Sequence, residues 1–113
     1  MKKVYVSHSY GRREGLSQID CLLNVISSIM VARELILKGY NPFCPNLWHY
    51  LHSGWESSPN EDIWLELVSA WISNCDCVLV AKESCRADSG VQKEIKLARS
   101  LGIPIFYNIE DIK

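Results

Sequence analysis

The chain has 113 residues, enough for one hydrophobic core but not for two, so we expect a single domain over residues 1–113. Apolar residues make up 48% of the sequence and charged residues 22%, a composition typical of a folded chain. The formal net charge of −1 argues against a general surface for nucleic acid or for an anionic membrane. No apolar run approaches the length of a membrane span.

The five cysteines follow neither a disulfide framework nor a structural zinc motif, because their number is odd and no CxxC pair occurs. Cys75 and Cys77 alternate within an apolar run and are expected on one face of a strand. His49 and His52 form an HxxH pair without a third metal ligand nearby. We therefore predict no metal and no cofactor. Since no signal peptide opens the chain, we expect a cytoplasmic protein.

The first half of the chain predicts a strand, a helix and a second strand. Val4–Ser7 is a β-rich run. Ser17 and Asp20 form a capping box before a helix that ends at Gly39. Residues 40–44 are a weaker strand whose prolines suit the edge of a sheet. The apolar residues at helical spacing between the two strands are Cys21, Leu22, Val25, Ile26, Ile29, Met30, Ile36 and Leu37.

The second half predicts two more helix–strand pairs after an aromatic-rich loop over residues 46–60. Residues 61–73 form a helix, and residues 77–81 form a strand buried on both faces. A polar loop over residues 82–88 precedes a helix over residues 89–101 and a strand over residues 103–107. The residues assigned to the inner side of the first of these helices are Ile63, Leu67, Val68, Trp71 and Ile72.

This order, β-α-β-α-β-α-β, predicts a three-layer α/β/α sandwich with a small, mostly parallel sheet of about four strands, of the Rossmann or flavodoxin-like kind. Ligands bind such sheets at the carboxyl ends of the strands, near the switch in strand order. We therefore expect the loops at residues 8–16, 45–60 and 82–89 to meet at one site.

Glu94 is the most informative residue of the last helix. At about 100° per residue, it lies near the centre of the arc that carries Val91, Ile95 and Ala98. A carboxylate on a core-facing side is costly to desolvate unless it has a partner or a function. Gly90 lies one turn earlier and leaves space beside it. Glu94 therefore either organises the core through a partner or belongs to a catalytic site.

The segment Asp88-Ser89-Gly90-Val91-Gln92-Lys93-Glu94 resembles the Asp-x-Gly-x-x-x-Glu stretch of nucleoside 2-deoxyribosyltransferases and the Gly-Val-x-x-Glu of the related nucleoside 5′-monophosphate N-glycosidases. Residues 71–80 are similar to the helix-to-strand segment of that superfamily. Residues 11–14, Gly-Arg-Arg-Glu, resemble the loop after the first strand in the N-glycosidases. The strongest overall resemblance is to a phage and bacterial domain family of unknown function.

The resemblance implies a catalytic role for Glu94 as the nucleophile at the anomeric carbon and for Asp88 in handling the base. It implies that the backbone at Ser89 and Gly90 holds a 5′-hydroxyl or phosphate, as a helix N-terminus can. It also implies a homo-oligomer in which Asn108, after the last strand, reaches a neighbouring site. The enzymes carry a further aspartate on the second helix, and here that position is Val68.

Other candidate ligand-binding residues follow the first and second strands. His8 could replace the missing acid, since its ordinary pKa of about 6.5 suits proton transfer. Trp48, with Tyr50 and Trp55, could stack on a nucleobase or cover a neighbouring subunit. Arg12 and Arg13 are candidates for a phosphate. The remaining residues expected around the ligand are Ser7, Ser9, Tyr10 and Gly11.

Three functions remain open from the sequence. The first is an enzyme that cleaves or transfers the N-glycosidic bond of a nucleoside or nucleotide. The second is a nucleotide-binding module of the same fold without turnover, such as a sensor or a sequestering protein. The third is an interaction domain that uses the aromatic loop at residues 46–60 to dock a protein partner.

Overall fold

The structure is a computed structural model that describes residues 1–12 and 14–113. Arg13, one of the two arginines predicted to bind a phosphate, lies outside the described residues. Within the described part, no helix is long and apolar enough to cross a membrane.

The centre of the molecule is a four-stranded, all-parallel sheet. Its strands are β1 (Lys3–Ser7), β2 (Asn41–Phe43), β3 (Cys77–Val80) and β4 (Ile105–Phe106), in the order β2-β1-β3-β4. Tyr5 of β1 is in register with Phe43 on one side and Val78 on the other. The predicted edge position of β2 is confirmed. From β1 the chain goes first to one neighbouring strand and then to the other, so the switch in strand order falls at β1 and β3.

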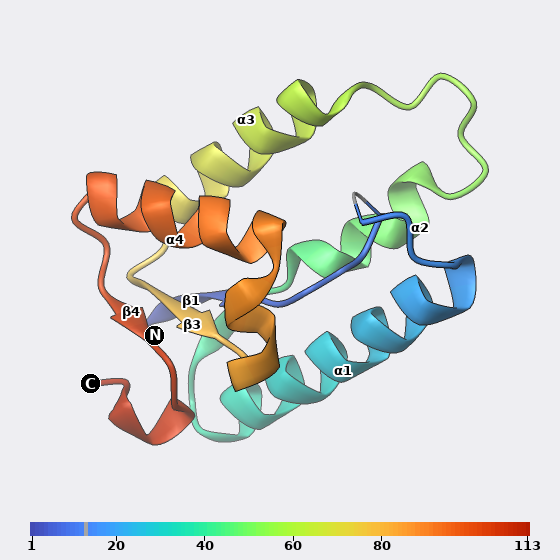
Figure 1. Cartoon of the computed structure of the whole chain (residues 1–113). Helices are drawn as coiled ribbons and strands as arrows, with labels where there is room; N and C mark the ends of the chain where they lie inside the picture. The colour runs from blue at the N-terminus through green and yellow to red at the C-terminus, as the bar shows by residue number, and fades with distance from the viewer. Residues whose placement is uncertain (13) are drawn as a thin grey trace.

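Helices cover both faces of this sheet, which confirms the predicted α/β/α sandwich. The long helix α1 (Gln18–Leu37) lies on one side together with the short turn η3 (Ile109–Asp111). Helices α3 (Glu61–Ser73) and α4 (Ser89–Ser100) lie side by side on the other (Figure 1). A polar side chain accepts a backbone hydrogen bond at the start of each: Ser17 for α1, Asn60 for α3 and Asp88 for α4.

The alternation of side chains along β1 divides the core into two layers. Val4 and Val6 pack toward α1, in a cluster with Leu35. Tyr5 packs toward α3 and α4, in a cluster with Ile72 and Ala98. Ser7, two residues after Tyr5, therefore also points to the α4 side. All four residues of β3 are buried, as predicted for a strand covered on both faces.

Three predictions about local structure are wrong. Residues 46–60 are not a plain loop, because they continue the 3₁₀ helix η1 (Pro45–Trp48) and contain the short helix α2 (His49–His52). A further 3₁₀ helix, η2 (Glu83–Ala87), occupies most of the polar loop before α4. Cys75 and Cys77 do not share a face: Cys75 precedes β3 and packs with Tyr5, whereas Cys77 packs in the α1 layer.

The predicted inner side of α3 is also partly wrong. On α3, Ile63, Leu67 and Trp71 are each more than 40% exposed, whereas Trp64 and Ile72 are buried. On α1, the buried residues are Cys21, Val25, Ser28 and Leu35. The apolar residues of α1 that are exposed are Ile19, Leu22, Leu23, Ile26, Met30, Ile36 and Leu37. Both helices are apolar on more than one side, so their apolar residues alone do not identify the inner face.

Candidate functional site

A pocket of roughly 760 Å³, part of it open to solvent, lies at the carboxyl end of the sheet. Its walls come from the segments after β1, β2 and β3 and from the first turns of α3 and α4, as the strand order predicts. The predicted site residues that line it are His8, Tyr10, Gly11, Arg12, Trp48, Asp88, Gly90 and Glu94.

Glu94 lies on α4 facing β1, at the inner end of this pocket. Tyr5 donates a hydrogen bond from its hydroxyl to Oε2 of Glu94. Ser7 donates another to Oε1, at 3.0 Å. The two donors are two residues apart on β1, so the pleat of the strand aims both at the same helix. Ser7 is thus a partner of Glu94 and does not itself line the pocket.

The burial of Tyr5 determines how it acts on Glu94. Its side chain is fully buried, and this burial, together with the negative charge of Glu94, holds the pKa of the phenol well above its usual range. Tyr5 therefore keeps its proton and remains a donor at physiological pH. Hydrogen bonds donated to a carboxylate favour its ionised form, which is the nucleophilic one.

The loop after β1 is fixed by its own backbone and by two asparagines. Gly11 has φ of +109°, and a Cβ there would overlap the side chain of Leu16, whose amide donates to the carbonyl of Gly11 at 3.0 Å. Asn24 of α1 donates to the carbonyl of Tyr10 at 2.8 Å, and Asn46 donates to that of Ser9 at 3.0 Å. These contacts place Tyr10 against α2.

Tyr10 forms a cluster with the two histidines of α2. Its hydroxyl hydrogen-bonds Nδ1 of His49 and lies 3.0 Å from Nε2 of His52. All three side chains line the pocket. His49 and His52 are three residues apart, which puts them on one side of a helix. A phenol and two imidazoles in one pocket can store and pass a proton.

The pKa values of the cluster depend on burial and on nearby charges. Burial raises the pKa of Tyr10 to about 12, although Arg12 opposes the change. Burial lowers the pKa of His52, and the charges of Arg12 and His49 lower it further, while Glu61 acts in the opposite direction. Tyr10 is therefore a phenol at neutral pH, and His52 becomes protonated only at a lower pH than an ordinary histidine.

Asp88 and Ser89 connect the start of α4 to the pocket. Asp88 lines the pocket and caps the helix, because its Oδ1 accepts from the amide of Val91 at 3.0 Å. Ser89 is exposed and donates to Oε1 of Glu14 at 2.6 Å. That contact ties α4 to the loop after β1. The Ser89 side chain does not line the pocket, whereas Gly90 does.

His8 lines the pocket but is only 5% exposed. Its Nδ1 lies 2.7 Å from the carbonyl of Ser9, and its Nε2 lies 3.0 Å from Oγ of Ser27. Burial raises the pKa of the neighbouring Cys85 thiol, but hydrogen bonds from His8 and Ser9 outweigh burial and bring that pKa down to about 7. His8 is therefore held by protein partners at both ring nitrogens.

Aromatic side chains form the pocket wall on the α3 side. Trp48 meets Phe43 edge-on at a ring distance of 5.7 Å and lies 5.6 Å from Trp64. The indole N–H of Trp64 is buried and has no hydrogen-bond partner in the described part of the chain. Val68, one turn further along α3, also lines the pocket. The wall that carries an aspartate in the resembling enzymes is thus apolar at that position.

Asn108 does not line this pocket. It follows β4, and its side chain donates to Asp111 at 3.4 Å. Nor do Tyr50 and Trp55 line the pocket. Ser9 contributes its carbonyl and amide to the loop and not a side chain to the pocket.

Sequence reasoning missed the joint position of His49 and His52 with Tyr10. Their HxxH spacing in the sequence is that of a zinc motif and does not indicate the contact with Tyr10. Within residues 1–12 and 14–113 no group of three or more histidine, cysteine or acidic side chains is placed to hold a metal ion. The signal that could have found the cluster is the position of both histidines after β2, beside the loop that carries Tyr10.

No family model matches the chain, and no curated protein is significantly similar to it.

Proposed function

We propose that the chain cleaves or transfers the N-glycosidic bond of a nucleoside or nucleotide, with Glu94 as the nucleophile. The observation that carries the proposal is the pocket carboxylate of Glu94, which accepts hydrogen bonds at both oxygens from Tyr5 and Ser7. A carboxylate so held can capture an oxocarbenium-like carbon, as in retaining glycosidases. The resemblance of residues 88–94 to the deoxyribosyltransferases and N-glycosidases supports the same role.

The proposed reaction has two steps. An oxygen of Glu94 bonds to the anomeric carbon as the bond from that carbon to the base nitrogen breaks, and the electron pair leaves with the base. The base takes a proton from the enzyme. Water, or a second base in a transfer reaction, then attacks the anomeric carbon and releases the carboxylate. The proton of the attacking group returns to the enzyme.

We assign the proton donor to the cluster of Tyr10, His49 and His52. The position expected to supply an acid is Val68, which has no proton to give. Both ring nitrogens of His8 already have protein partners, so His8 is less suited to the role predicted for it. Tyr10 and His52 line the same pocket as Glu94 and are hydrogen-bonded to each other, so a proton that leaves one can be replaced from the other.

The other residues would hold the ligand. Trp48 offers an aromatic surface for a base, and the buried N–H of Trp64 could donate to a polar atom of the ligand. Arg12 and the backbone at Gly90 could bind a 5′-hydroxyl or phosphate. We further propose a cytoplasmic location, which fits five free cysteines, and a homo-oligomeric assembly.

The test is release of free base. The chain is incubated with ribonucleosides, deoxyribonucleosides and their 5′-monophosphates, and the products are separated by chromatography. Replacing Glu94 by Gln should lower the rate by about 10⁴-fold or more, because the nucleophile is lost. Glu110→Gln, on the exposed turn η3, is the matched control and should keep the full rate.

Two results would contradict the proposal: base release that survives Glu94→Gln, and no release from any substrate. In the second case the alternative is a nucleotide-binding module, which the apolar side chain of Val68 in the pocket favours. Thermal unfolding then decides, since a ligand at 100 times its Kd raises the free energy of unfolding by about 2.7 kcal/mol.

A further inference from the structure

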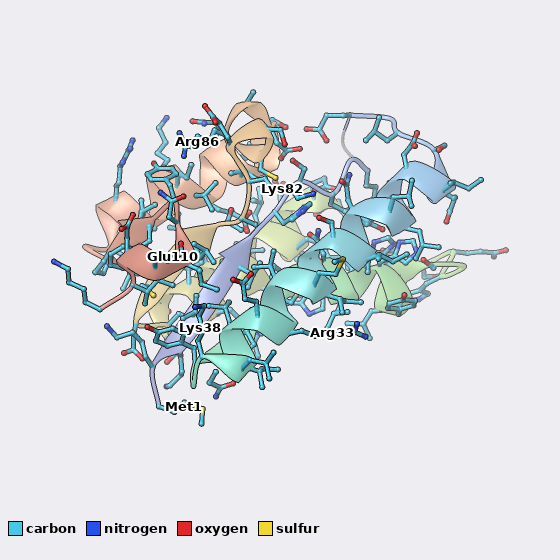
Figure 2. The ribbon with its side chains drawn as sticks, turned by 90° about the horizontal axis from the view of Figure 1, so that it is seen from below. Met1, Arg33, Lys38, Lys82, Arg86 and Glu110 are labelled. Atoms are coloured by element: carbon cyan, nitrogen blue, oxygen red, sulfur yellow. The ribbon has the colours of Figure 1, made fainter. Side chains whose placement is uncertain are left out.

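Helix α1 has an apolar outer side that no other element in the described part of the chain covers. Its inner side, with Cys21, Val25, Ser28 and Leu35, is buried against the sheet. Figure 2 views the molecule from below, with α1 in front of the sheet and Arg33 labelled on the helix. The apolar residues along the outer side, each between 46% and 88% exposed, are Ile19, Leu23, Ile26, Met30 and Leu37.

The spacing of these residues is that of a coiled-coil seam. Positions 19, 23, 26, 30, 33 and 37 are separated by alternating steps of four and three residues. Such a seam meets a partner helix along its whole length, because it keeps facing the same side. The buried Cys21, Ser28 and Leu35 are seven residues apart and occupy the opposite side of the same heptad. One face of α1 therefore packs on the sheet, and the opposite face has the pattern needed to pack on a second helix.

Arg33, the only charged residue of the seam, determines which direction a partner helix can take. In a parallel pair of identical helices, Arg33 would lie opposite Arg33 of the other copy, and the two charges would repel each other. In an antiparallel pair centred between Ile26 and Met30, Arg33 lies opposite Leu23 of the second copy. It is then one turn from that copy's Asp20, so each end of the seam gains a pair of opposite charges.

The layers of the fold also favour a second helix at this place. The opposite face of the sheet is covered by two long helices, α3 and α4, whereas among the described residues α1 is the only long helix on its own face (Figure 1). A second copy related by a twofold axis would bring its own α1 alongside. The same surface then serves both partners, as a twofold interface requires.

We propose that the chain forms a homodimer through antiparallel packing of the outer seam of α1 on that of a second copy. Ile26 of each copy packs on Met30 of the other, and Ile19 packs on Leu37. Two pairs of Arg33 and Asp20 flank this apolar centre. The interface does not depend on the proposed enzymatic activity.

The first test is the mass in solution by sedimentation equilibrium. The chain should sediment with the mass of two copies, and Met30→Glu should shift it to one copy, because a carboxylate would be buried at the centre of the seam. Met30 is 63% exposed within one chain, so the variant should fold. Leu67→Glu, at an apolar position of α3 that is 41% exposed, is the matched control and should remain dimeric.

The second test determines whether the two α1 helices of the dimer run antiparallel. When chains carrying Ile19→Cys are mixed with chains carrying Leu37→Cys and oxidised, the antiparallel dimer should yield the mixed disulfide. Arg33→Glu should weaken the dimer, and the double variant Asp20→Arg/Arg33→Glu should restore it. The proposal is overturned by a monomeric wild type, by a dimer that survives Met30→Glu or dissociates with Leu67→Glu, or by disulfides between identical positions.

Discussion

Two walls of the pocket, one with Glu94 and one with Tyr10, are built from different kinds of structure. Glu94 is held by Tyr5 and Ser7, which come from the central strand of the sheet and are fully buried. Tyr10, His49 and His52 come from a loop and from a helix of only four residues. The first wall fixes one carboxylate with two donors, and the second shares a proton among three titratable groups. In the reaction we propose, attack on the sugar and protonation of the base can therefore be altered separately.

The largest effect on the Glu94 wall, short of replacing Glu94 itself, is expected from Tyr5→Phe. The substitution removes the hydroxyl that donates to Oε2 and leaves Ser7 as the remaining donor from β1. We expect base release to fall by about 10²–10³-fold for every substrate, as when one preorganised donor is removed from a buried site. Steady-state kinetics on at least two nucleosides measures the change.

Tyr107→Phe is the matched control, because Tyr107 packs under Arg86 and does not line the pocket. Its rate should equal that of the wild type. A Tyr5→Phe rate within about threefold of the wild type would mean that Glu94 does not need this donor. That result would contradict the role given to the hydrogen bonds from β1.

A smaller and more selective effect is expected from Tyr10→Phe and His52→Gln. Both variants should slow base release by about 10–10²-fold for ordinary nucleosides. They should leave the rate nearly unchanged for a 7-methylguanine nucleoside, whose base already carries a positive charge and leaves without a proton. The measurement is the ratio of the two rates in each variant, with thermal unfolding as a check of folding.

The pH dependence sharpens this prediction. His52 has a lowered pKa, from burial and from the charges of Arg12 and His49, with Glu61 opposing. Its protonated form therefore increases only as the pH falls below the ordinary value of about 6.5. Release of an unmethylated base should rise over that acidic range, and this rise should be absent in His52→Gln. An equal loss on both kinds of substrate would contradict the assignment of the acid.

The sequence predicted the architecture and the position of Glu94 beside the apolar residues of α4, because both depend on strong local patterns. Alternating strands and helices imply a parallel sheet, and helix α4 separates its polar and apolar residues clearly. Val91, Ile95 and Ala98 are buried as expected, with Glu94 beside them. The convergence of three loops on one pocket followed from the strand order alone.

The rest of the site could not be predicted because it depends on contacts between distant segments. The bonds from Tyr10 to His49 and His52 span about forty residues, and no local pattern specifies them. Nor could the inner faces of α1 and α3 be chosen, because both helices carry apolar residues on more than one side. On α1 those extra apolar residues form the seam proposed for the dimer.

The smallest effect is expected from Gly11→Ala, which tests how the loop that carries Tyr10 is held in place. A Cβ at position 11 would be strained at φ of +109° and would overlap the side chain of Leu16. We expect the free energy of unfolding to fall by about 1–3 kcal/mol, the usual cost of such backbone strain. Gly15→Ala is a matched control in the same loop, because Gly15 also has a positive φ but has nothing within 4 Å of its Cβ position. Chemical denaturation of both variants isolates the cost of the overlap.

The same variant also has a kinetic readout. If Gly11 only shapes the loop that carries Tyr10, Gly11→Ala should slow release of ordinary bases more than release of 7-methylguanine. Equal slowing of both would mean that the loop also positions Glu94.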